Sequence, residues 1–265
     1  MQFKNRYSMQ DLLDIVALLR EPEHGCPWDR AQTHASIRKN FLEETYEVAD
    51  AIDLGDAHLL CEELGDVLLQ VALHTQMEAE QAAFTFEDVT TGICQKLILR
   101  HPHVFGDGKA ATPEAVLQNW EAIKRTEKHR ESAADNLDSV PAALPALMRS
   151  RKVQKRAAEY GFRYENADAA MADLDREMIE LKAALHANDA ENIEEEIGDV
   201  LFSVVNVSRF TGCDAEEALG KATAKFVRRV KAVELLAQGQ GKELHVLSAE
   251  ELDKLWKQAK VFTKS

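Results

Sequence analysis

Two pairs of carboxylates in the first half of the chain have a spacing that could support chemistry. Glu44 and Glu47 lie three residues apart, and so do Glu63 and Asp66. On a helix, residues i and i+3 share a face, so each pair presents two carboxylates side by side. Between the pairs the chain reads DLGD, which predicts a short turn at Gly55. Helices joined by so short a turn run antiparallel, so we expect all four carboxylates to face one space.

The chemistry of such a quartet is metal binding. Carboxylates gathered beside an apolar core repel one another and resist ionisation. A hard divalent cation with oxygen ligands removes that repulsion, and Mg²⁺ is the usual ion where phosphates complete the coordination shell. The alternative interpretation is a solvated acidic face, because carboxylates are common on protein surfaces.

The pattern recurs in the second half of the chain. A second quartet follows the first at a constant interval of 133 residues, and its members are Glu177, Glu180, Glu196 and Asp199. The surrounding segments, ELGDVLLQVAL and EIGDVLFSVVN, are also alike. The interval is too long for a solenoid repeat, so it predicts a duplicated domain. The recurrence weakens the interpretation as a solvated face.

Basic residues and a tryptophan follow each quartet at helical spacing. The set in the first half is Lys96, Arg100, Trp120 and Lys124, and the set in the second half is Lys225, Arg229, Trp256 and Lys260. Arginine offers a bidentate fork and lysine a point charge, so cations beside a carboxylate–metal site suit a polyphosphate. The tryptophan rings either stack on a base or pack against a helix. Single basic residues at such spacing are usually solvated, and it is the double recurrence that favours binding.

Length and composition predict a globular cytoplasmic protein. A chain of 265 residues forms one large domain or two of ordinary size. Its formal net charge of −14 argues against a general nucleic-acid binder. The N-terminus lacks the long apolar run of a signal peptide, and no segment is apolar enough to cross a membrane. The four cysteines are scattered and form no CxxC motif, which indicates free thiols in a reducing cytosol.

Helical periodicity runs through nearly the whole sequence, and no convincing strand is present. We therefore expect an all-α fold made of two tandem copies of a helical-bundle domain. The expected domains are residues 1–130 and 151–265, with a linker at 131–150. The expected helices are residues 8–20, 36–53, 57–80, 86–100, 113–131, 141–160, 166–186, 189–210, 214–237 and 248–262.

Several separated motifs, in order, give the chain a family resemblance. They are EExxE at Glu43–Glu47 with ExxD at Glu63–Asp66, GCPWDRAQTH, RHPHVFGD and LDSVPAALPALMRSRKVQKRAAEYGF. With these motifs the chain resembles the MazG family of tandem-domain nucleoside triphosphate pyrophosphohydrolases over essentially its whole length. The resemblance implies paired helical bundles, usually in a homodimer. It also implies hydrolysis of a nucleoside triphosphate to the monophosphate and pyrophosphate, with Mg²⁺ (or Mn²⁺ as an alternative ion). The role implied is house-cleaning or control of the nucleotide pool.

We interpret the site residues in the light of this resemblance. The two quartets are the expected metal ligands, and the two basic sets are expected to bind substrate. The expected catalytic residues are Glu43, Glu44 and Glu177. In the first site Glu43 is the candidate that orients or deprotonates the attacking water, while the protein mainly positions the triphosphate and neutralises its charge.

The second copy departs from the family pattern near its quartet. Arg176 stands where the family has the first glutamate, and Asp173 and Asn192 stand where the family often has lysines. These changes favour an impaired second site, whereas the intact quartet and the basic set downstream favour a working one. The sequence leaves the ranking of the two sites open, and it leaves the preferred base and sugar open as well.

Two other classes of function fit the pattern less well. A di-iron carboxylate bundle needs Glu-x-x-His on two helices. The chain has that spacing only from Glu21 to His24, in a loop rich in proline and glycine. A non-catalytic helical protein that regulates partners by contact is the other alternative, which exposed apolar stripes without metal dependence would favour. Phosphate-binding motifs of other folds, GxxxxGK[ST] and GxGxxG, are absent from the sequence.

Overall fold

The protein is all-helical, as expected. The structure is a computed structural model that describes residues 3–127 and 132–262, and in those residues it contains helices and no strand. The chain divides into two compact units, Met1–Lys128 and His129–Ser265. Within the described ranges, no helix combines the length and the apolar character needed to cross a membrane.

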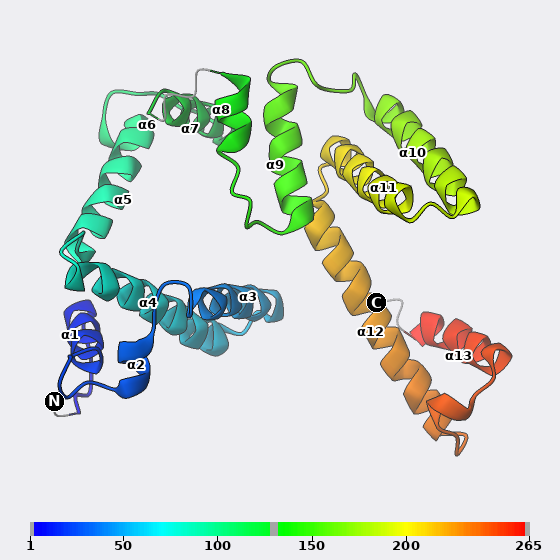
Figure 1. The fold of residues 1–265 in the computed structure, drawn as a ribbon, viewed down its shortest axis with the longest axis horizontal. Helices are drawn as coiled ribbons and strands as arrows, with labels where there is room; N and C mark the ends of the chain where they lie inside the picture. The colour runs from blue at the N-terminus through cyan, green and yellow to red at the C-terminus, as the bar shows by residue number, and fades with distance from the viewer. Residues whose placement is uncertain (1–2, 128–131, 263–265) are drawn as a thin grey trace. The chain divides into compact units, whose positions relative to one another are not determined.

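The first unit contains seven helices among its described residues (Figure 1). They are α1 (Met9–Leu19), α2 (Pro27–Ala31), α3 (Arg38–Leu54), α4 (Ala57–Glu80), α5 (Phe86–Arg100), α6 (Pro102–Phe105) and α7 (Pro113–Glu127). Capping side chains fix where several of these helices begin, because their oxygens accept hydrogen bonds from backbone N–H groups of the first turn, which have no partner within the helix. Ser8 forms a capping box with Asp11 before α1, and Thr85 forms one with Asp88 before α5.

The core of the first unit lies where α1 meets the second half of α4. Val16, Ala72, Leu73 and Met77 are buried there together with Ile37, which directly precedes α3. An ion pair reinforces the same contact, since Arg20 donates to both carboxylate oxygens of Glu80 at 2.8 and 2.9 Å. This packing holds α4, whose first half carries Glu63 and Asp66, against the rest of the unit.

The second unit contains six α-helices and one 3-10 turn among its described residues. They are α8 (Ala133–Asp138), α9 (Ala146–Ala158), α10 (Ala167–Ala187), α11 (Ala190–Thr211), α12 (Ala215–Gln238), the 3-10 turn Leu244–Val246 and α13 (Ala249–Phe262). Val233 and Ala237 of α12 pack against Leu255 and Ala259 of α13 in its core cluster.

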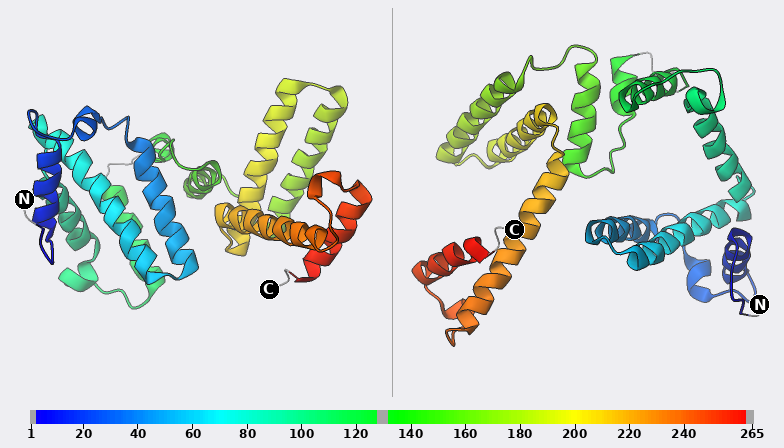
Figure 2. Two further views of the ribbon diagram at one scale, coloured as in Figure 1. Left: turned by 90° about the horizontal axis from the view of Figure 1, so that it is seen from below. Right: turned by 180° about the vertical axis from the view of Figure 1, so that it is seen from behind.

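A pair of long antiparallel helices with a two-residue turn occurs in each unit. Figure 2 shows α3 beside α4, and α10 beside α11. In each unit the pair is followed by a further helix, α5 after α4 and α12 after α11. The element order thus repeats as the internal sequence repeat predicts.

The structure differs from the sequence-based expectation in its short helices. Ala133–Asp138 form α8 within the range 131–150, which we expected to be a linker. Helix α9 begins at Ala146, five residues after the start of the expected helix 141–160. Pro27–Ala31 form α2 inside a segment that we expected to be a loop. Helices this short carry too few residues to show periodicity. Residues 128–131, where the expected helix 113–131 ends and the expected linker begins, lie outside the described residues.

Candidate active site

The first carboxylate quartet lies on α3 and α4, which a compact turn holds side by side. Helix α3 ends at Gly55, whose φ of 67° lies in the left-handed region that glycine adopts at low cost. Asp56 then starts α4, because its carboxylate accepts hydrogen bonds from the backbone N–H groups of His58 at 2.9 Å and Leu59 at 3.1 Å. The turn therefore reverses the chain within two residues and brings the two acidic pairs together.

The carboxylates of the first quartet are close enough to repel one another. Single carboxylate oxygens of Glu44, Glu63 and Asp66 all lie within 4.8 Å of one another. Burial raises the pKa of Glu44, and the charge of Asp66 and a hydrogen bond with Glu47 raise it further. Burial likewise raises the pKa of Glu63, with the charges of Glu47 and Asp66 adding to the effect. Glu47 falls outside the compact triplet but contacts two of its members, and Glu43 lies exposed beside Glu44 on α3.

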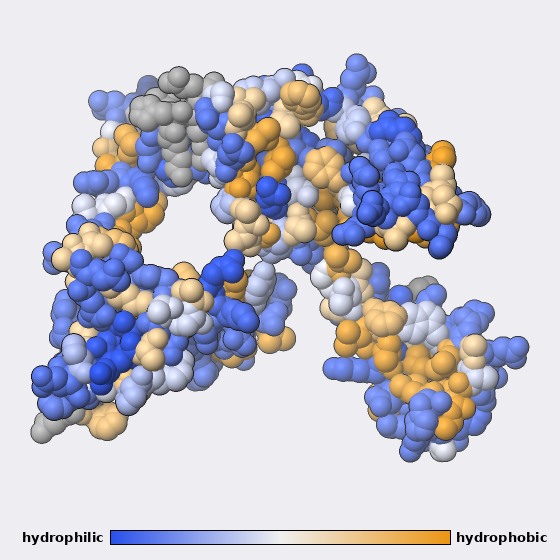
Figure 3. All heavy atoms as spheres, viewed as in Figure 1, coloured by the Kyte–Doolittle hydropathy of each residue, from blue (hydrophilic) through white to orange (hydrophobic). Residues whose placement is uncertain are grey.

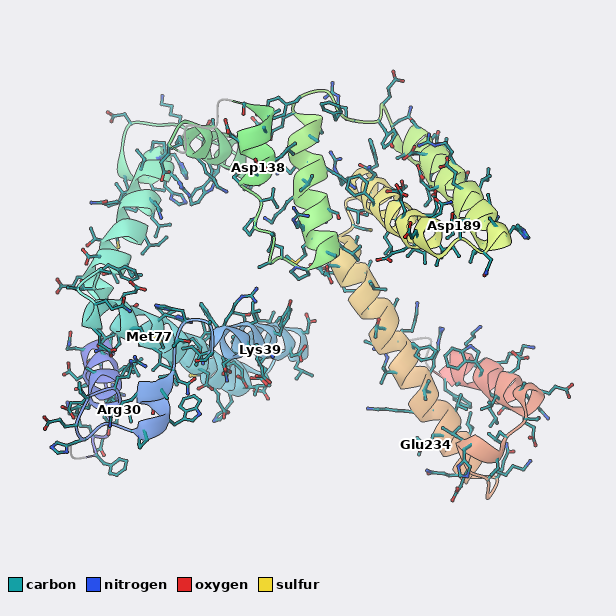
Figure 4. All side chains as sticks on the ribbon, in the orientation of Figure 1. Arg30, Lys39, Met77, Asp138, Asp189 and Glu234 are labelled. Carbon is teal, nitrogen blue, oxygen red and sulfur yellow. The ribbon has the colours of Figure 1, made fainter. Side chains whose placement is uncertain are left out.

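The second quartet is built by the same device. Helix α10 ends at Asn188 with a φ of 54°, and Asn is the residue that tolerates this conformation best after glycine. Asp189 then accepts a hydrogen bond from the backbone N–H of Asn192 and starts α11; Figure 4 labels Asp189 at this turn. The second compact triplet, with oxygens within 4.8 Å of one another, is Glu177, Glu196 and Asp199.

Glu196 is the most deeply placed member of the second quartet. Only 8% of the residue is exposed, and its buried Oε2 atom has no hydrogen-bond partner in the part of the chain that the structure describes. Burial raises its pKa, and the charges of Glu180, Asp199 and Glu177 raise it further. A buried carboxylate oxygen without a donor is costly, and a bound cation would satisfy it.

Arg176 lies against the second quartet. Its Nη2 atom donates to Oε1 of Glu177 at 2.8 Å, and its Nε atom lies 3.6 Å from Oε1 of Glu180. It also donates to Asp173, which accepts hydrogen bonds from Tyr164 Oη and from Ser203 Oγ, the latter at 3.2 Å. Glu180 thus falls outside the compact triplet and contacts a guanidinium instead.

Both triplets fit a hard divalent cation by the chemistry of their donors. Each is made only of carboxylates, the ligands that Mg²⁺ takes from proteins. Oxygens that share one Mg²⁺ at about 2.1 Å lie at most about 4 Å apart, so spacings within 4.8 Å need only a small inward adjustment. The orphaned Oε2 of Glu196 points to the same conclusion in the second copy.

The first basic set lies on α5 and α7. Arg100 is buried and donates through Nη2 and Nε to Oε2 of Glu127, at 2.7 and 3.0 Å. Its guanidinium carbon lies 5.1 Å from the centre of the Trp120 ring, which His101 meets edge-on. The structure therefore brings Arg100 and Trp120 together, while Lys96 stands exposed on α5.

The second basic set lies on α12 and α13. The guanidinium of Arg229 lies 5.9 Å from the Trp256 ring, and Phe226 packs beside that ring at 5.4 Å. The Trp256 ring also lines an apolar cavity of about 500 Å³ together with Val230, Val233, Leu244 and Leu252. Lys225 and Lys260 are exposed on the same two helices, and Lys124 is the partly buried counterpart of Lys260 on α7.

Three groups of contacts were not found from the sequence. Tyr164 and Ser203 hold Asp173, but they come from different segments and no spacing relates them. Glu127 pairs with Arg100 across two helices. His34 contacts His74 and Glu78; of these, the i, i+4 spacing of His74 and Glu78 on α4 was the one detectable signal.

Comparison with known proteins places both quartets in one kind of domain. The family described as MazG nucleotide pyrophosphohydrolase domain matches residues 32–105 and again residues 165–234. A nucleoside triphosphate pyrophosphohydrolase of Escherichia coli is 44% identical over 253 residues, which cover 94% of this chain and 95% of that protein. A protein of Thermotoga maritima named nucleoside triphosphate pyrophosphohydrolase/pyrophosphatase MazG is 43% identical over 251 residues, with 95% of each chain covered.

Proposed function

The chain belongs to the MazG nucleotide pyrophosphohydrolase family, and on that premise we propose that it hydrolyses nucleoside triphosphates to nucleoside monophosphate and pyrophosphate with Mg²⁺ as its cofactor. Mn²⁺ is the alternative ion. The observation that supports the proposal most directly is the duplicated triplet of carboxylate oxygens, each within 4.8 Å. Control of the cellular nucleotide pool is the role that we propose for this reaction.

In the first copy, residues of α3 and α4 would together bind the cation, and a residue of α3 would activate the water. Glu44, Glu47, Glu63 and Asp66 would hold the cation, which supplies positive charge to the triphosphate when bound. Glu43, one residue before the first ligand on α3, would orient a water and accept its proton. The water oxygen attacks the α-phosphorus, the bond from that phosphorus to the bridging oxygen breaks, and pyrophosphate leaves.

The residues of the second copy offer a comparable arrangement with one substitution. Glu177, Glu180, Glu196 and Asp199 would hold the cation there. In both copies the basic sets would neutralise the phosphates, and the rings of Trp120 and Trp256 offer faces for a base. A guanidinium next to an indole ring, as for Arg100 and Arg229, is restricted in its orientation. A phosphate that binds Arg100 would have to share or replace its ion pair with Glu127.

We also propose that the chain forms a homodimer in the cytoplasm. Large apolar side chains are exposed along α5 and along its repeat equivalent α12. They include Ile93, Leu97, Ile98 and Leu99 on α5 and Leu219, Phe226 and Val227 on α12. Patches of this kind mark interaction surfaces. The four cysteines are free thiols, which suits a reducing compartment.

Product analysis tests the proposed reaction. The protein is incubated with Mg²⁺ and each common ribo- and deoxyribonucleoside triphosphate, and the products are separated by ion-exchange chromatography. We expect monophosphate and pyrophosphate in equal amounts, and loss of turnover in excess EDTA that added Mg²⁺ restores. Diphosphate and orthophosphate as first products, or full activity in EDTA, would contradict the proposal.

The same assay on Asp66→Asn and Asp199→Asn assigns turnover to the two sites. Each change removes one ligand charge and nearly keeps the side-chain shape. Because even the outer partners of metal ligands contribute about 10–100-fold, we expect the double variant to lose at least that factor in kcat/KM. The single variants report the share of each site. A double variant with full activity would remove the carboxylate sites from the mechanism.

A further inference from the structure

A positively charged side chain, that of Arg176, lies beside the second quartet. Arg176 donates to Glu177 at 2.8 Å and lies 3.6 Å from Glu180, so its guanidinium covers two of the four carboxylates. The equivalent position in the first copy, 133 residues earlier, is Glu43. The two sites therefore differ by two charge units at this position, with an anion beside the first quartet and a cation beside the second.

A buried anion holds Arg176 in place. Asp173 lies one turn earlier on α10, with only 8% of the residue exposed, and it accepts hydrogen bonds from Tyr164, Ser203 and Arg176. Burial and the hydrogen bond with Asp173 raise the pKa of Tyr164 to about 12, so the phenol stays a donor at neutral pH. A buried carboxylate needs a paired cation, and Arg176 is that cation. The equivalent residue in the first copy is the uncharged Asn40.

On the opposite wall of the second site, the described residues place no basic side chain against Glu196. The buried Oε2 atom of Glu196 on α11 has no hydrogen-bond partner among the described residues. Carboxylate oxygens of Glu177 and Asp199 lie within 4.8 Å of a carboxylate oxygen of Glu196. The guanidinium thus satisfies the α10 side of the quartet and leaves the α11 side open. A divalent cation held by carboxylates of both helices would have to share or displace the contact between Arg176 and Glu177.

We propose that Arg176 competes with the divalent cation for Glu177 and Glu180, so that the second site binds the cation more weakly than the first. The inference rests on the proposed function, because it takes the quartets to be metal sites. Beyond that function, the inference gives Arg176 a role in setting the metal affinity of the second site alone. The two sites then fill at different metal concentrations although their ligands are the same.

Metal binding without nucleotide tests this directly. Isothermal titration with Mg²⁺, checked by the electron paramagnetic resonance of bound Mn²⁺, gives the Kd of each site separately. Asp199→Asn leaves the first site intact, and Asp66→Asn leaves the second. We expect a Kd at least about tenfold higher in Asp66→Asn than in Asp199→Asn. Adding Arg176→Gln to Asp66→Asn should lower the Kd by about tenfold.

A matched control separates the specific effect from the change in net charge. Lys182→Gln removes one positive charge from an exposed position on the same helix, and in the Asp66→Asn background it should leave the Kd unchanged. If Arg176→Gln unfolds the unit by leaving Asp173 unpaired, the pair Asp173→Asn with Arg176→Gln removes the buried anion as well and should show the same gain in affinity. Circular dichroism checks the fold of each variant.

The possible outcomes distinguish this inference from the proposed function. Equal Kd values for the two sites, or no gain in affinity on removing Arg176, would overturn the inference and leave the proposed function standing. The absence of metal binding in the wild type and in every variant would contradict the proposed function, and the inference would fall with it.

Discussion

At the scale of single residues, the hydrogen bonds of one cluster outside the proposed sites, His34 with His74 and Glu78, depend on the protonation of its histidines. The Nδ1 atoms of His34 and His74 lie 2.7 Å apart, and Nε2 of His34 lies 2.7 Å from Oε1 of Glu78. The two imidazole rings are stacked with their centres 5.0 Å apart. A hydrogen bond between two ring nitrogens requires that one of them lack a proton. The pair therefore holds together only while at least one ring is neutral.

The histidine pair predicts a loss of stability on mild acidification. Burial lowers the pKa of His74, and the neighbouring His34 lowers it further. An unfolded chain takes up this proton near pH 6.5, whereas the folded ring takes it up only at lower pH. The stability that neutral His74 contributes is thus present above about pH 6.5 and is lost as the pH falls through the window below it.

The measurement is the thermal unfolding midpoint at pH 7, 6 and 5 for the wild type and for His74→Gln. Gln does not titrate, so the midpoint of the variant should fall less between pH 7 and pH 5. The difference between the two proteins is what matters, because the raised pKa values of Glu44, Glu63 and Glu196 act in the opposite direction in both. Parallel pH profiles would show that the pair carries no proton linkage.

At the scale of elements, substitutions in the two turns that join the carboxylate helices should change stability in opposite directions. Gly55 has a φ of 67°, and a Cβ there would meet nothing within 4 Å, so the cost of Gly55→Ala is a backbone cost alone. We expect that change to lower the free energy of unfolding by about 1–2 kcal/mol. Asn188 has a φ of 54°, and Asn188→Gly should raise that free energy by up to about 1 kcal/mol.

Urea unfolding followed by circular dichroism gives both values. Gly92→Ala in the middle of α5 is the control, because a Cβ there also meets nothing within 4 Å but the backbone is helical. It should raise the free energy of unfolding by about 0.5–1 kcal/mol. If Gly55→Ala were as stabilising as Gly92→Ala, the left-handed turn would not be what limits this position.

The long helices were predictable because apolar periodicity, capping residues and helix-breaking residues indicate similar helix ends. Helix α4 occupies residues 57–80 as expected, with Asp56 as its cap, and α10 and α11 differ from expectation by one residue at each end. That the two acidic pairs of the first quartet face one another followed from the turn predicted at Gly55, and the structure has a second left-handed turn residue at Asn188. Contacts between distant segments, such as Tyr164 with Asp173 or Arg100 with Glu127, depend on how the helices pack, and no spacing along the chain encodes them.

At the scale of the whole molecule, apolar surface that the described residues leave exposed predicts self-association. Figure 3 shows apolar side chains gathered over α12 and α13. On α5 and α12, Ile98 is 53% exposed and Phe226 is 57% exposed. A second copy that covers these faces would bury them, at a gain of roughly 25 cal/mol per Å² of apolar area removed from water.

Sedimentation velocity tests the homodimer, and we expect the wild type to sediment as a dimer at micromolar concentration. The double change Ile98→Glu and Phe226→Glu should shift it toward the monomer, because a carboxylate in an apolar interface must be desolvated. Lys109→Glu, which adds an acidic charge in the loop between α6 and α7, serves as the control and should leave the dimer intact. A wild type that is monomeric at all concentrations would contradict the proposal.

The two-residue turns between the carboxylate helices also bear on when each copy of the site forms during protein synthesis. Closing so short a loop costs little chain entropy, and contacts between sequence neighbours form quickly. The first helical hairpin is complete once residue 80 has left the ribosome, while the second unit is still to be synthesised. Under the proposed function, its carboxylates would bind an ion while the rest of the chain is still being synthesised. One copy of the site can therefore mature during translation, before its duplicate exists.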